Sequence, residues 1–353
     1  MTDVDNGGSR VALLRKTRDL TQAALARRAG ISVSLLSKIE VGDRTLTPTV
    51  AVAIARALRI SLDALHEEIE ITEDQSELLK DLRTAVRRYD IPDQAAVPEP
   101  ARLRAEVDQA IALKSRADMA GLLRILPDLL RRATTYAHAA ASPPGWALLA
   151  EVYYLTYWLA AQHRWIDLVE IAPIHQAWAA AQQPLPTAAA TANRAGTFLQ
   201  RGDFAGGLAV VDQGIIAAET ALSGPEKTFA TGRLHLTGMT LAGRLGERAQ
   251  TQQHMHAART AAEQFPHDLR LQAMLFGPAR TTTDVLATEG DLGRPRNVIR
   301  LSEELFRTDT ALPANRICST HISTARAHLD LGHRDNAETS LLRAWHTAPQ
   351  RAK

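Results

Sequence analysis

Apolar side chains recur at helical spacing along most of the chain. Between residues 20 and 40, which read LTQAALARRAGISVSLLSKIE, two short patterns of this kind meet at Gly30. A glycine inside a helix costs about 1 kcal/mol relative to alanine, so this position is expected to be a turn between two helices. Thr21 and Ser32 are good N-cap residues for the helices on either side.

The second of these helices is expected to be amphipathic. Its inward stripe consists of Leu35, Leu36 and Ile39. The other side carries Val33, Ser34, Ser37 and Lys38. Two helices joined by a short, glycine-containing turn form a helix-turn-helix, whose second helix can enter the major groove of DNA.

The stretch from Arg10 to Leu65 resembles the Cro/C1-type (XRE) DNA-binding domain of bacteria and their phages. The resemblance rests on the Leu-Thr-Gln start, the small Ala26, Gly30 in the turn and the closing TPTVAVAIARALRISLDAL. It implies a lambda-repressor-like fold, a backbone phosphate held by Gln22, and base contacts from the first turns of the second helix. On this chain the implied base contacts are Ser32, Val33, Ser34, Ser37 and Lys38.

These residue types suit base recognition. Lys38 can donate to guanine O6 and N7, serine hydroxyls can bond several base edges, and Val33 can contact a thymine methyl group. No Arg, Asn or Gln stands among the readers, so DNA shape and dimer symmetry are expected to add to specificity. Arg44 and Thr45, in the loop after the helix, are candidate phosphate contacts, which position a protein without selecting sequence.

Charge is segregated along the chain. Residues 10–60 contain ten Lys or Arg and three acidic residues, a formal charge of +7. Residues 61–77 contain seven acidic residues and no Lys or Arg. The basic segment favours a nucleic-acid partner for the helix-turn-helix. Within it, Arg15 and Glu40 occupy the positions where members of the resembled family often have an ion pair between the first helix and the recognition helix.

Beyond residue 101 the pattern predicts helix hairpins separated by short turns. The turn signals are KSRAD at 114–118, QHRW at 162–165, RGDF at 201–204, LGER at 245–248, GDLGR at 290–294 and LGHR at 331–334. The spacings between the last five of these turns, 39, 44, 46 and 41 residues, indicate a repeat of about 40 residues. The architecture is similar to tetratricopeptide repeats, with a longer period and a degenerate signature.

The expected fold is all-α, with almost no sheet, and has three segments. Residues 1–70 form the helix-turn-helix domain, and residues 71–100 a helical linker with prolines at 92, 98 and 100. Residues 101–353 form a tetratricopeptide-like α-solenoid for dimerisation and for binding an effector or partner. This layout resembles bacterial regulators that include receptors for short signalling peptides, and an actinobacterial group whose ligands are generally unassigned.

Polar residues in the first helices of the hairpins are the candidates for effector binding, because those helices line the concave side of such arrays. They are Asn193, Arg194, Arg233, Asn315 and Arg316. The alternative is that they are exposed or capping polar residues. An aromatic cluster within residues 146–178 belongs either to the core or to a pocket for an apolar ligand. Its members are Trp146, Tyr153, Tyr154, Tyr157, Trp158, Trp165 and Trp178.

No constellation of residues points to catalysis. The sequence lacks GxxxxGK[ST], HExxH and GxSxG, and its twelve histidines are scattered, so no catalytic residue, metal or cofactor is expected. A lone cysteine, Cys318, and the absence of a signal peptide or of a run of ~18 apolar residues predict a cytoplasmic protein that joins the nucleoid when bound to DNA.

These features predict a sequence-specific transcriptional regulator. It would act as a homodimer on a two-fold symmetric operator in double-stranded DNA, under the control of a peptide, small molecule or protein bound in the helical repeats. The alternative is an interaction adaptor, such as a toxin neutraliser, in which the repeats capture a partner and the helix-turn-helix only autoregulates.

Overall fold

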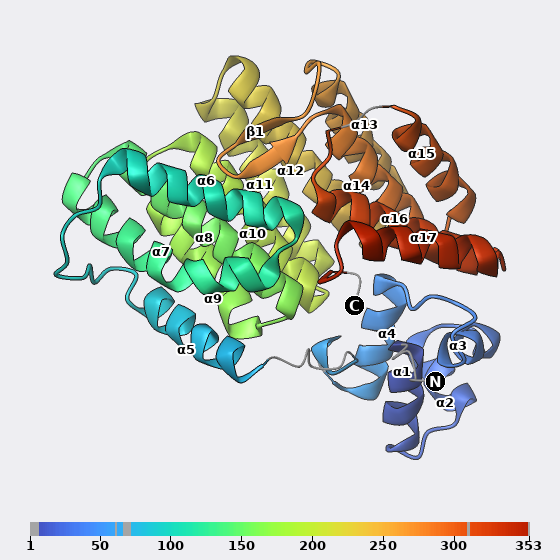
Figure 1. Cartoon of the computed structure of the whole chain (residues 1–353). Coiled ribbons are helices and arrows are strands. Elements are labelled where there is room, and N and C mark those ends of the chain that lie inside the picture. The colour runs from blue at the N-terminus through green and yellow to red at the C-terminus, as the bar shows by residue number, and fades with distance from the viewer. Residues whose placement is uncertain (1–6, 61, 66–71, 309–310, 352–353) are drawn as a thin grey trace.

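The chain forms a small helical head and a larger helical body (Figure 1). The computed structural model describes residues 7–60, 62–65, 72–308 and 311–351. Within these residues the regular structure comprises seventeen α-helices, one 3-10 helix and one two-stranded hairpin, which confirms the all-α prediction. Among the described helices, none has the length and apolar composition needed to cross a bilayer.

The head is a bundle of four α-helices closed by a 3-10 turn. Its elements are α1 (Gly7–Lys16), α2 (Gln22–Ala29), α3 (Val33–Glu40), α4 (Pro48–Leu58) and η1 (Leu62–Leu65). Fully buried apolar side chains from every element, among them Val11, Leu25, Leu36, Ile54 and Leu65, form its core. Each side chain of this size contributes about 1.5–3 kcal/mol when it is buried.

The turn predicted at Gly30 is confirmed. Gly30 follows α2 with a φ of 67°, a left-handed conformation that glycine adopts without steric cost. The hydroxyl of Thr21 accepts a hydrogen bond from the Ala24 amide, and that of Ser32 accepts one from the Leu35 amide, each at 3.1 Å. Both helices of the helix-turn-helix therefore begin at the predicted caps.

Close contact between α1 and α3 depends on Gly8, which the sequence pattern did not single out. A Cβ atom at this position would lie 1.8 Å from the carbonyl oxygen of Ile39. Because that oxygen belongs to the main chain, a side chain at Gly8 would force the two helices apart.

The body is a row of six helix hairpins within the described residues. The hairpins are α6 (Pro100–Arg116) with α7 (Met119–Ala140), α8 (Pro143–His163) with α9 (Ile166–Ala180), α10 (Pro184–Arg201) with α11 (Phe204–Ala221), α12 (Gly224–Leu245) with α13 (Arg248–Ala262), α14 (Pro278–Asp291) with α15 (Pro295–Arg307), and α16 (Ala314–Asp330) with α17 (Arg334–Thr347). Each of the six predicted turns lies between the two helices of one hairpin, so the repeat prediction is confirmed.

One helix outside the hairpins also belongs to the body. Helix α5 (Glu73–Arg87) falls in the range 71–100 that was expected to be a linker, and it packs against α7. The side chains that it contributes to the body core are Leu79, Leu82, Ala85 and Val86. The stretch between α5 and α6 carries Pro92 and Pro98 and contains no regular element, and Pro100 is the first residue of α6.

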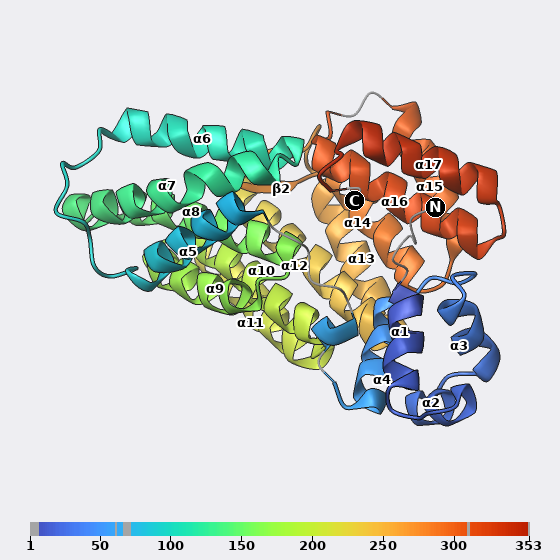
Figure 2. The ribbon, with the colours of Figure 1, turned by 60° about the horizontal axis from the view of Figure 1, so that its bottom comes forward.

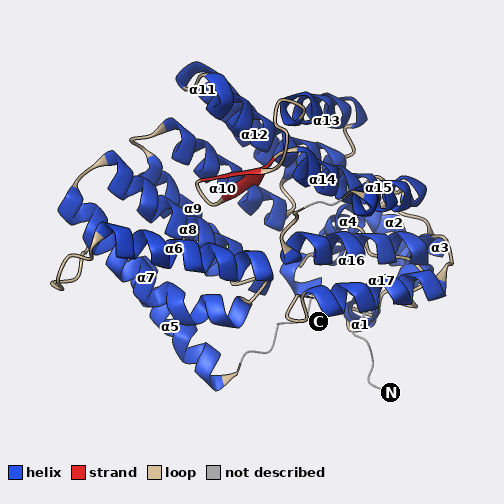
Figure 3. Cartoon of the chain, turned by 45° about the horizontal axis from the view of Figure 1, so that its top comes forward, coloured by secondary structure: helices blue, strands red, loops and turns tan. Residues whose placement is uncertain are grey.

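A short β-hairpin interrupts the helices between α13 and α14 (Figure 3). Strands β1 (Leu269–Leu271) and β2 (Met274–Phe276) pair in antiparallel register, with Leu271 opposite Met274. The turn residues Gln272 and Ala273 both have positive φ, at 49° and 56°. Neither is a typical residue for such a turn, which explains why the sequence did not indicate it.

The last hairpin returns to the first. The Asn315 amide, at the start of α16, donates to the carbonyl oxygen of Lys114 in α6 at 3.0 Å. The Gln350 amide, after α17, donates to the carboxylate of Asp118 at 3.2 Å. The row of hairpins therefore curves far enough to bring together segments that lie about two hundred positions apart (Figure 1).

We expect Gly8→Ala to destabilise the head by about 1–3 kcal/mol, because the added methyl group overpacks the contact with Ile39. Gly7→Ala is the matched control, since a Cβ at Gly7 meets Leu46 at an ordinary 3.6 Å. Urea unfolding monitored by circular dichroism measures the difference. Equal stability of the two variants would contradict the close approach of α1 and α3.

Candidate DNA-binding surface

Helix α3 presents one face to solvent and the other to the core. Val33, Ser34 and Lys38 are exposed, whereas Leu36 and Ile39 are fully buried. Val33 keeps 45% of its surface exposed, although it is a large apolar side chain. In Figure 2, α4 lies beside the body and α3 lies at the opposite edge of the head. The predicted base contacts thus share a surface that another molecule can approach.

The two remaining predicted base contacts lie at the edges of this surface. Ser32 is exposed and its hydroxyl oxygen caps α3, which leaves the hydroxyl hydrogen free to donate. Ser37 is half-buried, one turn further along the helix.

An ion pair inside the head fixes the orientation of α3. The guanidinium of Arg15 in α1 donates to both carboxylate oxygens of Glu40, at 2.7 and 2.8 Å, and a third hydrogen bond reaches the Leu20 carbonyl at 2.7 Å. The predicted pair between the first helix and the recognition helix is therefore confirmed. Burial by itself would raise the pKa of Glu40, but its hydrogen bonds from Arg15 and Gln22 outweigh burial, and its pKa is lowered. The pair stabilises the head above the ordinary pKa of Glu and loses this effect as the pH falls through the lowered value.

Gln22 supports the same pair. Its amide nitrogen donates to Glu40 Oε2 at 2.8 Å. This nitrogen carries two hydrogens, so one is engaged with Glu40 and the second is available to a phosphate oxygen. The phosphate contact of Gln22 stays a prediction.

Arg44 and Thr45 are not part of the open surface of α3. The Arg44 guanidinium lies 3.2 Å from the carboxylate of Asp330 at the end of α16, and donates to the Asp330 carbonyl at 3.1 Å. Thr45 lines a pocket between the head and helices α14, α15 and α16. Both residues were expected to contact DNA phosphates. In this conformation they face the body, because the loop after α3 contacts helices of the body.

Two further contacts hold the head on the body. The Thr49 hydroxyl in α4 donates to the Arg244 carbonyl in α12 at 2.9 Å. Asp43 accepts from Arg334 of α17 at 3.4 Å, in a pair that is largely exposed. Exposed pairs of this kind contribute about 0–1 kcal/mol each. Val52 of α4 adds an apolar contact, since its side chain packs against the core of the body.

The five candidate effector residues do not form one group. Asn193 is buried and its amide donates to the Gln176 side chain at 2.7 Å, so it serves the core of the body. Arg194 is exposed on the same helix. These two placements match the alternative of structural or exposed polar residues.

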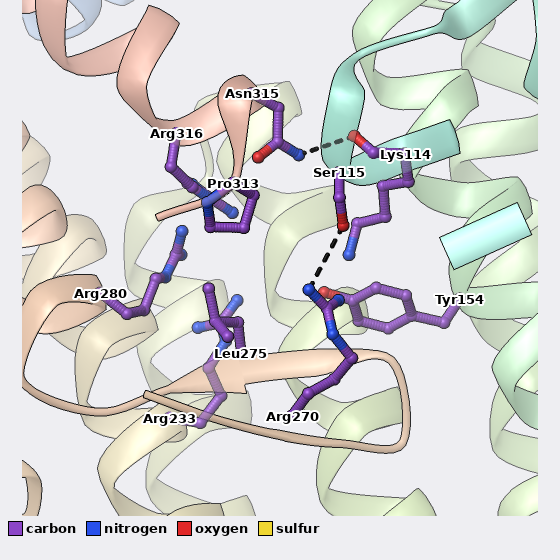
Figure 4. A pocket seen from close by; sticks show the side chains of 10 residues that line it. All are labelled: Lys114, Ser115, Tyr154, Arg233, Arg270, Leu275, Arg280, Pro313, Asn315 and Arg316. Carbon is purple, nitrogen blue, oxygen red and sulfur yellow. Dashed lines mark hydrogen bonds between the residues drawn. The ribbon is translucent and has the colours of Figure 1, made fainter. Parts of the chain in front are cut away.

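Arg233, Asn315 and Arg316 do come together, in a pocket enclosed by α6, α8, α12, the β-hairpin, α14 and α16 (Figure 4). The other lining residues are Lys114, Ser115, Tyr154, Arg270, Leu275, Arg280 and Pro313. The sequence pattern did not single out Lys114, Arg270 and Arg280, since nothing local distinguishes them from solvated basic residues. Of the aromatic cluster, Tyr154 reaches the pocket, while Tyr153 is fully buried in the core.

The described residues contain no group of three His, Cys, Asp or Glu side chains that could hold a metal ion. His254 is buried and His256 exposed, as expected for positions two apart on a helix. Cys318 is fully buried among small residues at the end of the body.

Comparison with known proteins finds relatives of the head. A helix-turn-helix family model matches residues 11–65. The protein YazB of Bacillus subtilis (strain 168), described as an uncharacterized HTH-type transcriptional regulator, is 40% identical over 58 residues, which are 16% of this chain and 84% of YazB.

Solved structures are similar at low identity. PlcR of Bacillus thuringiensis, in complex with the peptide PapR7 and DNA, is 15% identical, with 74% of this chain and 95% of PlcR covered and a TM-score of 0.27. ComR of S. thermophilus, in complex with DNA and its signalling peptide ComS, is 10% identical, with 95% and 99% covered and a TM-score of 0.30.

The exposed recognition helix, the Arg15–Glu40 pair and the capped turn at Gly30 are thus found in a head that matches the family model and a regulator of the same kind. The chain belongs to the helix-turn-helix (XRE-type) family of DNA-binding transcriptional regulators.

Proposed function

We propose that the chain recognises a specific operator through α3. The observation that carries this proposal is the exposed face of Val33, Ser34 and Lys38 on a helix whose opposite face is fully buried and tied to α1. A recognition helix must be held rigidly for its side chains to meet base edges in register. Lys38 would donate to guanine, Ser32, Ser34 and Ser37 would bond other base edges, and Val33 would contact a thymine methyl group.

We further propose that the regulator is a homodimer joined through α17. Leu341, Leu342 and Trp345 lie on one side of this last helix, and are 47%, 52% and 44% exposed. Exposed apolar side chains that gather on one face of a helix are typical of an interface. A second copy on this face would pair two heads and so match a two-fold symmetric operator.

Contacts between the head and the body would allow an effector bound to the body to change the affinity for DNA. Arg44 is held by Asp330, which ends α16, and Thr49 by Arg244, whose side chain pairs with Asp291 at the end of α14 at 2.8 Å. A ligand that binds differently to two arrangements of α14 and α16 would change the position of the head. We propose that Arg44 exchanges Asp330 for a DNA phosphate when the regulator binds its operator.

Replacement of Lys38 and Ser34 by alanine is expected to weaken the recognition of the operator. Genomic fragments retained by the purified chain, sequenced at two salt concentrations, would reveal a two-fold symmetric site for the wild type. On that site the double variant should bind more weakly by about 1–3 kcal/mol, because a base contact is lost.

Lys80→Ala is the matched control for this experiment, since Lys80 is an exposed lysine of α5, outside the head. It should leave the enriched site unchanged. Retention without an enriched site, steeply dependent on salt and equal in all three proteins, would contradict specific recognition and favour the adaptor function.

The double variant Leu342→Glu with Trp345→Glu is expected to be a monomer, because four charges would be buried in the symmetric interface. Sedimentation velocity should give a dimer for the wild type. Ile216→Glu places a charge on another apolar side chain, 64% exposed on α11, and should leave the dimer intact. A monomeric wild type, or a dimer that survives the double variant, would disprove the α17 interface.

Asp330→Asn is expected to tighten DNA binding by up to about fivefold, because a partly exposed ion pair of about 1 kcal/mol no longer holds Arg44. In an Arg44→Ala background, Asp330→Asn should leave the affinity for DNA unchanged. Fluorescence anisotropy with the enriched site measures all four proteins. An effect of Asp330→Asn that persists without Arg44 would show that Arg44 does not exchange partners.

A further inference from the structure

The pocket of Figure 4 is unusually rich in positive charge. Its walls carry five cationic side chains from five different elements: Lys114 of α6, Arg233 of α12, Arg270 of β1, Arg280 of α14 and Arg316 of α16. The carboxylates that act on Arg280 are those of Asp284 and Asp268. These two leave a formal excess of three positive charges in one place.

The two carboxylates are already engaged. Asp284 Oδ2 lies 2.6 Å from Arg280 Nη2, and its other oxygen lies 3.9 Å from Arg316 Nη1. Asp268 accepts hydrogen bonds from the main-chain amides of Ala279 and Arg280 at the start of α14, at 2.9 to 3.1 Å. Of the other cations, Lys114 donates to the Ala273 carbonyl at 3.2 Å and Arg233 to the Thr237 hydroxyl at 2.9 Å, and these neutral acceptors balance no charge.

Arg280 is the cation of this pocket whose hydrogen-bond donors are least satisfied. The residue is only 4% exposed, and its Nε and Nη1 atoms are buried without a hydrogen-bond partner. A buried charge that is only partly paired costs several kcal/mol, so such donors are normally satisfied. Burial lowers the pKa of Arg280 and also that of Lys114. Both shifts have the direction expected of cations that lack a full set of anionic partners.

The neighbouring groups suit an anionic ligand that also carries a hydrogen-bond donor. Asn315 is 5% exposed, and its Oδ1 atom is buried without a partner. Pro313, which precedes α16, leaves the amino-terminal end of this helix without a side-chain cap, and such an end favours a negative group. The ring of Tyr154 lies 4.5 Å from Lys114 Nζ, on the far wall of the pocket.

The size of the pocket limits what can enter it. The enclosed part of the pocket is small, with a cavity volume of about 20 Å³, and it opens to solvent on one side. Since one water needs roughly 10–15 Å³, the enclosed part admits only a small group, and the rest of a ligand would lie towards the open side. Arg270, the exposed member of the pocket, donates to Ser115 at 3.3 Å.

We propose that this pocket binds the phosphate group of a small phosphate monoester, with Arg280, Arg316 and Arg233 as its main ligands. A phosphate dianion offers three acceptor oxygens and two charges to a site that has several arginine forks and an excess of three positive charges. A carboxylate offers one charge and two oxygens, and leaves more of this excess uncompensated. Asn315 Oδ1 would accept a hydrogen bond from a hydroxyl or amide on the rest of the ligand.

The pocket is connected to the head through α14 and α16. Arg280 lies in the first turn of α14 and Arg316 in the first turn of α16, and the far ends of these helices are Asp291 and Asp330. Those far ends pair with Arg244 and Arg44, at the docking surface of the head. An effect of phosphate binding on DNA binding rests on the proposed function, whereas the binding of phosphate does not.

Isothermal titration of the full chain with inorganic phosphate, phenyl phosphate and acetate, at constant ionic strength, tests the proposal. Saturable binding of both phosphates, with acetate at least about tenfold weaker, is the expected result. No saturable binding of either phosphate would overturn the proposal. Equal affinity for acetate would overturn the preference for phosphate and assign the pocket to a carboxylate.

Variants locate the site. Arg280→Gln and Arg316→Gln should each weaken phosphate binding at least about tenfold, through the loss of a charged hydrogen-bond donor. Arg300→Gln, an exposed arginine of α15, is the matched control and should bind as the wild type does. Circular dichroism verifies that each variant folds; if Arg280→Gln does not, Arg316→Gln and Arg233→Gln decide. Unchanged affinity in the folded variants would place the phosphate elsewhere and refute the proposal.

A final titration separates this proposal from the proposed function. Anisotropy with the enriched DNA site, with and without saturating phenyl phosphate, should show a change in affinity that is absent in Arg316→Gln. Phosphate binding by a chain that retains no specific DNA would support the pocket and refute the regulator. Specific DNA binding by a chain that binds no phosphate would support the regulator and refute the phosphate pocket.

Discussion

A helix hairpin cannot bury its apolar face alone, and the whole body of this protein depends on that constraint. Each of the six hairpins covers the next, and α5 covers one side of α7. The first helices are rich in alanine and glycine, so neighbouring helices approach closely; Tyr153, Phe229 and Phe276 fill the wider spaces and are fully buried. Because the stack curves, its last hairpin meets its first.

The return of α16 to α6 has an electrostatic consequence. It brings Lys114, Arg280 and Arg316 into one pocket, although 166 and 202 positions separate Lys114 from the two arginines. Apolar burial in the hairpins must offset the cost of holding these cations out of water. A protein that maintains such an arrangement has a preformed site for an anion, in which the donors are already oriented. The same helices end at the head, so ligand and DNA would act on a shared pair of elements.

Several features could be predicted because they are encoded within a few residues. Thr21, Gly30 and Ser32 mark the turn of the head through capping and backbone preference, and short glycine or arginine motifs mark the hairpin turns. The Arg15–Glu40 pair came from the family resemblance and is present. The β-hairpin could not be predicted, because Gln272 and Ala273 adopt left-handed conformations that their residue types do not favour. Nor could the inclusion of α5 in the core, since the prolines after it suggested a linker.

The sequence by itself determined the all-α class, the helix-turn-helix head, the exposed face of α3 and the succession of hairpins. All of these follow from periodicity, caps and turns, which act over a few residues. Only the tertiary structure decided that Arg44 meets Asp330, 286 positions away, that Asn193 is a core residue, and that Asn315 and Arg316 share a pocket with Lys114. A polar side chain has the same local pattern whether it faces solvent, a partner or a ligand. Its role is settled by the elements that fold against it.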